Sequence, residues 1–119
     1  MRGGTILVVD PAPAAEKVDA YNRMDGLRDP SHARALCLDE HLELFRRAGL
    51  PEPRVTRYRL ESDLDALMSR SFPEPGDAEK IRALILADLA GDTMDLHVRR
   101  DGERVRLGHP IAVLASRRP

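Results

Sequence analysis

The feature that most constrains this chain is an apolar run a few residues from its start. Thr5-Ile6-Leu7-Val8-Val9 is continuous and rich in β-branched residues, and it ends at Asp10 and Pro11. Such a run is typical of a strand buried on both faces, as in a parallel α/β sheet. A strand of that kind needs a neighbour on each side, and little sequence precedes this one. We therefore expect its neighbours to come from later in the chain or from another chain.

The remaining sequence contains helix-like and strand-like segments and no internal repeat. We expect helices over residues 14–27, 38–48, 62–70 and 77–90, and strands over residues 54–61, 96–100, 104–107 and 110–116. Local signals define several of their ends. Asp39 is expected to cap the second helix, Gly49 to end it, Ser62 to cap the third, and Asp101-Gly102 to form a hairpin turn. The order predicts an α/β fold with too few strands for a closed sheet.

The segment Arg54–Glu61 alternates between polar and apolar residues. Thr56, Tyr58 and Leu60 share one face, which predicts a strand buried on that face and lying at a sheet edge.

Composition narrows the classes of protein to which the chain can belong. Its 119 residues suggest one domain, and a net charge of −1 provides no long-range attraction to nucleic acid or an anionic membrane. A single cysteine, Cys37, excludes an intrachain disulfide and a cysteine-based zinc site. No segment has the form of a signal peptide or approaches the roughly 20 apolar residues of a membrane span. We expect a cytoplasmic protein without nucleic-acid or membrane partners.

Three stretches, in order along the chain, resemble class I S-adenosylmethionine-dependent methyltransferases, in particular the ubiquinone- and menaquinone-biosynthesis type. Arg2-Gly3-Gly4 and the strand that follows are similar to the "PGG" turn and fifth strand of that fold. Residues 27–50, with Arg28-Asp29-Pro30-Ser31-His32 and then a helix ending in Ala48-Gly49-Leu50, closely resemble the family's RDPSH block. Residues 111–119 are similar to its final antiparallel strand, which commonly ends in a basic residue and proline.

This resemblance implies a fold class and a domain organisation. The expected fold is α/β: a partial Rossmann-like methyltransferase sheet, built from the last strands and helices of the fold, with a mixed sheet and an antiparallel final strand. Residues 1–119 are expected to form a single truncated methyltransferase-like domain that lacks the N-terminal cofactor-binding half.

The family binds S-adenosylmethionine through a Gly-rich loop after its first strand and an acidic residue at the end of the second. The loop brings backbone N–H groups to the ligand, and the carboxylate accepts from the ribose hydroxyls. This chain has no such loop, because Gly3-Gly4 precedes its strand. We expect that the chain by itself binds no S-adenosylmethionine. A late start, a remnant gene and a fragment put to another use all remain open as explanations.

The resemblance places the segment around His32 on the substrate side of the pocket. It implies His32 as a catalytic residue that orients or deprotonates a nucleophile, and Asp29, Ser31 and Arg34 as substrate-binding residues. The alternative is a helix-breaking turn in which Asp29 and Ser31 cap backbone N–H groups.

Asp10 is a candidate for cofactor binding, because ligand crevices lie at the C-terminal ends of parallel strands. Its alternative is a turn or helix-capping aspartate. His41 and His97 have no partners at metal-ligand spacing, and we expect no metal site. His109 is expected in a loop, and Cys37 as a small buried residue.

These observations favour a methyltransferase-like fragment, inactive alone, whose relatives methylate a small molecule. The alternative is a non-catalytic interaction module that assembles as a homodimer through an exposed sheet edge. A small enzyme that uses His32 without S-adenosylmethionine is a third possibility.

Overall fold

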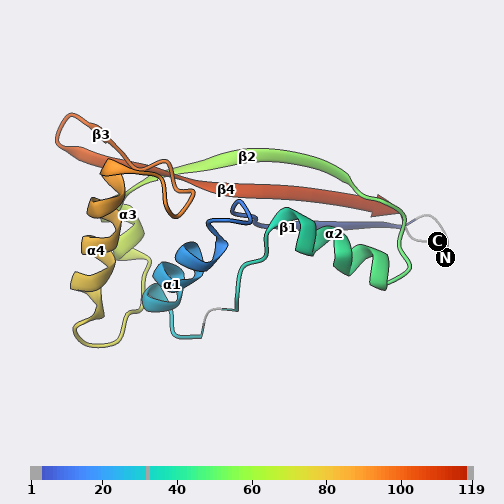
Figure 1. Ribbon diagram of the computed structural model, residues 1–119, viewed down its shortest axis with the longest axis horizontal. Helices are drawn as coiled ribbons and strands as arrows, with labels where there is room; N and C mark the ends of the chain where they lie inside the picture. The colour runs from blue at the N-terminus through green and yellow to red at the C-terminus, as the bar shows by residue number, and fades with distance from the viewer. Residues whose placement is uncertain (1–3, 32, 118–119) are drawn as a thin grey trace.

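The computed structural model describes residues 4–31 and 33–117, which form an elongated molecule with principal extents of 50 × 29 × 25 Å (Figure 1). Its elements are β1 (Thr5–Pro11), α1 (Val18–Arg28), α2 (Leu38–Arg47), β2 (Arg54–Asp63), α3 (Leu64–Ser69), α4 (Asp77–Ala87), the 3₁₀ turn η1 (Asp88–Ala90), β3 (Arg99–Asp101) and β4 (Arg104–Arg117). The predicted α/β class is confirmed. No helix within these described ranges is long and apolar enough to cross a membrane.

The last strand, β4, organises the sheet. It pairs antiparallel with β2 on one side, and on the other side with β3 near its start and with β1 near its end. The antiparallel final strand is therefore confirmed. The expectation of a mixed sheet is wrong for the described residues, in which every strand pairing is antiparallel. The reason is that β4 lies between β1 and β2, which run in the same direction but do not touch as strands.

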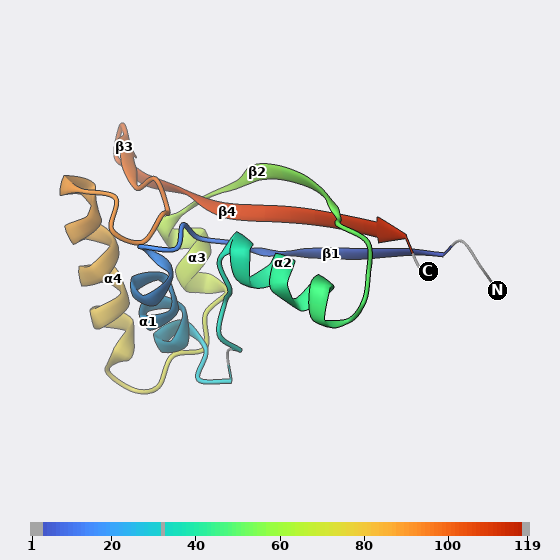
Figure 2. The same cartoon turned by 45° about the vertical axis from the view of Figure 1, so that its right-hand side comes forward.

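The first strand forms where the apolar run predicts it, but within residues 4–31 and 33–117 only β4 pairs with it. Ile6 and Val8 are half-buried next to α2, whereas Leu7 and Val9 are 61% and 51% exposed. The prediction that β1 is buried on both faces is thus wrong for the structure as described. The strand lies at the edge of the sheet, and only one of its faces is packed (Figure 2).

The strand β2 lies at the other edge, as expected, but its apolar face is not the buried one. Tyr58 and Leu60 are 47% and 51% exposed. On the opposite face, Val55 packs near α2, and the Arg59 guanidinium bonds to Asp95, 2.8 Å away. The predicted inward face was therefore wrong. The face that turns inward carries Arg59, whose charge is compensated by Asp95, and the face with Tyr58 and Leu60 is left exposed.

Local signals determine where α2 begins and ends. Cys37, and not Asp39, is its N-cap residue, and the Glu40 carboxylate accepts a hydrogen bond from the Cys37 N–H at 3.1 Å. Gly49 ends the helix with a φ of +70°, a conformation that glycine adopts without steric cost. The Leu50 N–H then bonds to the Phe45 carbonyl at 3.0 Å, which satisfies one of the last helical carbonyls.

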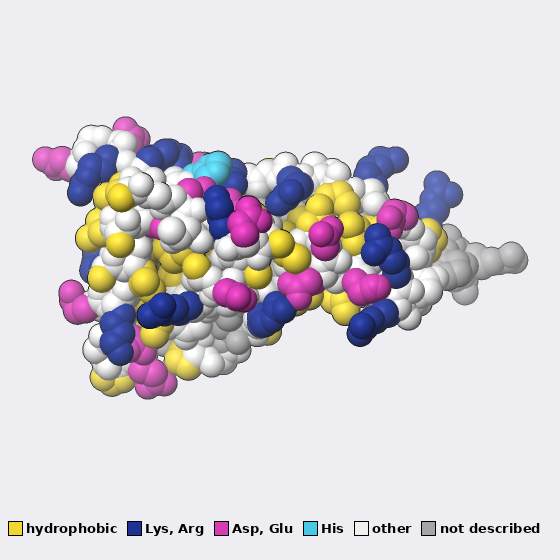
Figure 3. All heavy atoms as spheres, viewed as in Figure 1, with side chains coloured by type: hydrophobic (Ala, Val, Ile, Leu, Met, Phe, Trp, Pro, Cys, Tyr) yellow, Lys and Arg dark blue, Asp and Glu magenta, His cyan; other side chains and the backbone are white. Residues whose placement is uncertain are grey.

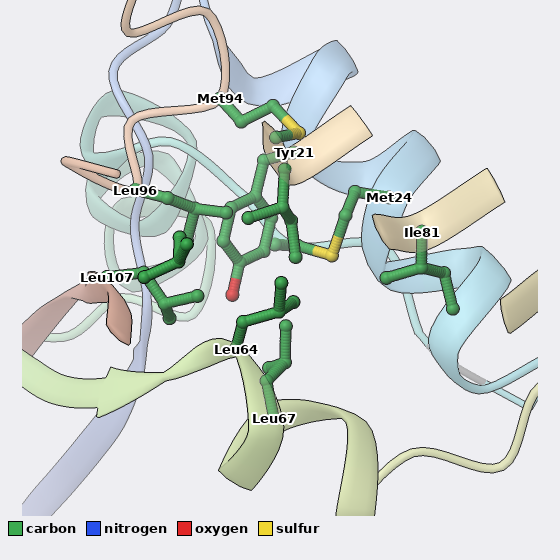
Figure 4. Packing of buried hydrophobic residues seen from close by; sticks show 11 residues of the cluster. Tyr21, Met24, Leu64, Leu67, Ile81, Met94, Leu96 and Leu107 are labelled. Atoms are coloured by element: carbon green, nitrogen blue, oxygen red, sulfur yellow. The ribbon is translucent and has the colours of Figure 1, made fainter. Parts of the chain in front are cut away.

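The larger hydrophobic core lies between α1, α3, α4 and the first half of β4 (Figure 4). Its fully buried members include Tyr21, Met24, Leu67, Ile81 and Leu107. Asp63, and not Ser62, caps α3, because its carboxylate accepts from the Ala66 N–H at 2.8 Å.

A smaller core joins α2 to the second half of the sheet. Phe45 packs there against Ala12, Ala112 and Leu114. In the first half of β4 the residues that point into the core have odd numbers, such as Leu107. In the second half they have even numbers, such as Ala112 and Leu114. The two cores occupy opposite ends of one long strand and are covered by different helices.

Candidate functional site

An apolar groove lies between β1 and α2 and has a volume of about 260 Å³. Most of its walls are apolar, and its two titratable side chains are Asp10 and His41. The lining residues are Ile6, Val8, Asp10, Leu36, His41, Leu44, Phe45 and Leu50. Figure 3 shows apolar atoms between charged groups both in the half of the molecule that carries α2 and at the end that carries α4. The groove runs along the free edge of the sheet.

Asp10 occupies the groove side of β1 near the end of the strand, opposite Ala112 of β4. It is exposed. It does not cap a helix, since α1 begins at Val18 with Lys17 as its N-cap residue. Its position at a strand end is as predicted, but the neighbouring strand is antiparallel, so no crevice between parallel strands is formed here by the described residues.

His41 contributes a buried imidazole to the groove. Its side chain comes from the first turn of α2, and Nε2 lies 3.5 Å from the Pro11 carbonyl oxygen. The ring therefore links the helix to the end of β1.

The predicted substrate-binding residues lie outside the groove, in the connection from α1 to α2. One Asp29 carboxylate oxygen accepts from the Ser31 N–H at 3.0 Å and from the Ser31 hydroxyl at 2.7 Å. Arg34 is exposed and pairs with Glu40 at 2.6 Å. These contacts form the turn that was the alternative interpretation of this segment. His32 lies outside the described residues.

Asn22 fixes the second half of this connection and was not predicted as a site residue. Its side-chain oxygen accepts from the Ala35 N–H at 2.6 Å, and its side-chain nitrogen donates to the Ala35 carbonyl at 2.9 Å. The Asn22 side-chain amide thereby supplies the hydrogen-bond partners that buried Ala35 would otherwise need from another backbone segment. We call these two hydrogen bonds the Asn22 clamp. Leu36, which follows Ala35 directly, lines the groove, so the clamp fixes both this part of the groove wall and the neighbouring Arg34 segment.

A buried titratable pair lies in the larger core. The Tyr21 hydroxyl is 3.4 Å from His109 Nδ1, and the two rings meet edge to face at a centroid separation of 6.3 Å. Burial lowers the pKa of His109 to about 4, with a further contribution from Arg28, and burial also raises the pKa of Tyr21. The prediction that His109 lies in a loop is wrong, because it belongs to β4.

The loop after α4 brings three potential metal ligands together. Ligand atoms of Asp92, Asp95 and His97 lie within 4.8 Å of one another. However, Lys17 lies 3.4 Å from Asp92, and Arg59 lies 2.8 Å from Asp95. These cations already compensate the two carboxylates, so the cluster acts as an anchor between the loop, β2 and the start of α1. Sequence spacing alone did not reveal it.

Comparison with known proteins gives a match in structure but not in sequence. No family model matches the chain, and no curated protein matches it. The structure is similar to the YcgJ protein of Bacillus subtilis, with a TM-score of 0.82 and 18% identity over 98% of this chain and 52% of that one. It is equally similar to BH2331 of Bacillus halodurans, a candidate methyltransferase, with a TM-score of 0.82 and 18% identity over 99% of this chain and 57% of that one.

The chain thus spans about half the length of each of these proteins. At this level of identity the comparison establishes the fold: nearly all of this chain adopts the fold of part of a methyltransferase-like structure.

Proposed function

We propose that this chain is the substrate-side, C-terminal half of a class I S-adenosylmethionine-dependent methyltransferase of the ubiquinone/menaquinone type, acting on a small molecule. The observation that carries the proposal is the match of 99% of the chain to only 57% of BH2331. The order of the RDPSH-like segment and the closing strand supports it. Residues 1–119 are then one truncated methyltransferase-like domain.

The groove next to Asp10 does not fit S-adenosylmethionine on its own. That ligand carries a ribose, a base, an ammonium and a carboxylate, and it needs several donors and acceptors. The groove offers one carboxylate and one buried imidazole in mainly apolar walls. The described residues also provide no Gly-rich loop of the kind that binds such ligands. We infer that the isolated chain is inactive.

The contribution of this chain to a complete enzyme lies in the connection between α1 and α2. The exposed ion pair between Arg34 and Glu40 contributes little to stability, because such pairs are solvated and screened. Arg34 can therefore exchange Glu40 for an anionic group of a substrate at low cost. Asp29 and Ser31 shape the turn that presents this segment. His32, which the family resemblance implies as the catalytic residue, and Asp10 as a cofactor contact remain parts of the proposal.

Calorimetric titration of the chain with S-adenosylmethionine tests the inactivity directly. We expect no stoichiometric heat of binding at micromolar protein, and no methyl transfer to a quinol-like acceptor. Tight binding with one ligand per chain would show that the chain forms a complete cofactor site, and it would refute the inferred inactivity.

A second candidate function is supported by the open edge of the sheet. Paired through β1, two copies would form a homodimeric interaction module without catalytic activity. Leu7 and Val9, which are 61% and 51% exposed, would become buried in such a dimer. Sedimentation at micromolar concentration separates the two candidates, since a stable monomer contradicts the module.

A further inference from the structure

The loop between α3 and α4 is fixed to the end of α1 (Figure 1). The Phe72 N–H donates to the Arg28 carbonyl oxygen at 2.6 Å, which satisfies one of the carbonyls left open where α1 ends. The Arg28 guanidinium donates from Nε to the Ser71 hydroxyl oxygen at 2.9 Å. Arg28 is also the first residue of the RDPSH-like block. These two hydrogen bonds therefore fix the loop next to the segment on which the proposed function depends.

The side chain that holds this loop is itself held in place. Arg28 Nη1 lies 2.7 Å from Asp25 Oδ1, and the two side chains are only 19% and 14% exposed. The Ser71 hydroxyl, which accepts from Arg28, donates in turn to the Leu67 carbonyl oxygen at 2.7 Å. Bonds that are shielded from solvent in this way are stronger than bonds between exposed side chains. The backbone at Phe72 is thus anchored to two helices.

Two prolines stiffen the rest of the loop. Pro73 and Pro75 each have a fixed φ, and each disfavours the helical conformation in the residue before it. Phe72 precedes the first of them. The residue is therefore restricted by its neighbour in sequence as well as by its hydrogen bond to α1.

The Phe72 ring, in contrast, belongs to neither core. It is 74% exposed, a larger fraction than for any other large hydrophobic residue that the structure describes. Of the other aromatic residues, Tyr21 and Phe45 are buried. A single exposed apolar residue is common and by itself indicates nothing. Phe72 differs because its backbone is anchored directly beside the turn that begins at Asp29.

A ring held in this way is suited to a flat aromatic ligand. Two stacked aromatic rings gain about three- to tenfold in affinity beyond the effect of the area that they bury. The Phe72 backbone is already ordered, and its side chain has only two rotatable bonds, so little conformational entropy is lost on binding. A saturated ligand of the same size would gain the buried area but not the stacking.

We propose that Phe72 is a substrate-binding residue that stacks on the ring of a planar aromatic methyl acceptor and orients it along the segment that begins at Asp29. This inference rests on the proposed function. It adds to that function a residue from a different part of the chain and a class of acceptor ring.

Titration of the chain with 1-naphthol and with its saturated counterpart, decahydro-1-naphthol, tests this contact. The titration is followed through the amide signals in NMR spectra. We expect 1-naphthol to bind at least about threefold more tightly than the saturated alcohol. The largest shifts should fall on the amides of Ser31, Ser71 and Phe72.

Matched variants separate stacking from burial of apolar area. Phe72→Leu keeps an apolar side chain and the backbone bond to Arg28 but removes the ring, so it should bind the two alcohols equally, with an affinity for 1-naphthol about three- to tenfold lower. Phe72→Tyr keeps the ring and should retain the preference. Tyr58→Leu removes an exposed ring from β2 and serves as the control, with both affinities unchanged. Circular dichroism confirms that each variant is folded.

Three results would overturn the inference: no measurable binding of 1-naphthol, equal binding of the two alcohols by the wild-type chain, or a loss in Tyr58→Leu as large as that in Phe72→Leu. Titration with S-adenosylmethionine is read separately. A chain that prefers 1-naphthol through Phe72 but also binds S-adenosylmethionine retains this contact and refutes the inferred inactivity. Equal binding of the two alcohols by a chain that binds no S-adenosylmethionine refutes the contact alone.

Discussion

Replacing His109 with glutamine should remove much of the acid sensitivity of this protein. The His109 ring is buried against Tyr21, and its folded-state pKa of about 4 lies well below the ordinary value of 6.5. Between these two values the unfolded chain binds a proton that the folded protein does not. Stability is therefore complete above about pH 6.5 and falls as the pH approaches 4.

The magnitude follows from proton linkage. With 6.5 for the unfolded chain and about 4 for the folded protein, His109 accounts for a loss of about 2 kcal/mol between about pH 7.5 and pH 5, and about 3 kcal/mol below pH 4. The charged groups that act on the ring are Arg28 of α1 and Arg70, which favour the neutral form, and Asp25, which opposes them. None of them reverses the effect of burial.

Urea unfolding at the two pH values measures this loss for the wild-type chain, His109→Gln and His97→Gln. His97 is exposed, with its imidazole 3.6 Å from Asp92, and serves as the comparison for a surface histidine. The His109 variant should lose about 2 kcal/mol less than the wild type on acidification, whatever its absolute stability, whereas the His97 variant should stay within about 1 kcal/mol of the wild type, as expected for an exposed ion pair. If all three chains lose the same free energy, the ring is not desolvated and our account of the core is refuted.

Other predictions concern packing and loop geometry. Phe45→Ala should lower the free energy of unfolding by about 3–5 kcal/mol in urea melts, because it empties the smaller core, whereas Phe72→Ala, at a residue that is 74% exposed, should change it by less than about 0.5 kcal/mol. Asn22→Ala should cost about 1–3 kcal/mol and speed amide exchange at Ala35, since it removes both bonds of the clamp; unchanged exchange would contradict it. Gly49→Ala should cost about 1 kcal/mol through its φ of +70°, and no loss in a thermal melt would refute the assigned helix end.

Elements determined by local signals were predicted well from the sequence. The Asp101-Gly102 turn forms between β3 and β4, and Gly102 has a φ of +63°. The end of α2 at Gly49 was likewise predictable, because glycine there needs no information from elsewhere in the chain. Cap residues were less predictable, because nearby polar residues can also cap a helix. The sequence favoured Asp39 and Ser62, whereas the helices are capped by Cys37 and Asp63.

Features that depend on distant residues were not predictable. The alternation in β2 shows that its two faces differ, but not that Arg59 would turn inward to meet Asp95, 36 positions away. Tyr21 and His109 are 88 positions apart, and neither lies in a motif. For the candidate site, the position of Asp10 at a strand end was predicted, whereas the groove required knowledge of how α2 packs on β1.

The position of β4 at the end of the sequence has a consequence for how the protein folds. Among the residues that the structure describes, each of the other strands pairs with β4 alone, and the partners of β1 lie about a hundred positions further along the chain. During synthesis none of these described pairs can form until β4 has left the ribosome, so the edge of β1 that faces β4 waits unpaired while the helices form. Such non-local pairing slows folding and leaves an apolar strand open to wrong partners. The chain should therefore depend on chaperones more than its helical content suggests, and loss of residues 111–117 should remove every pairing of β1 and about half of the pairing of β2.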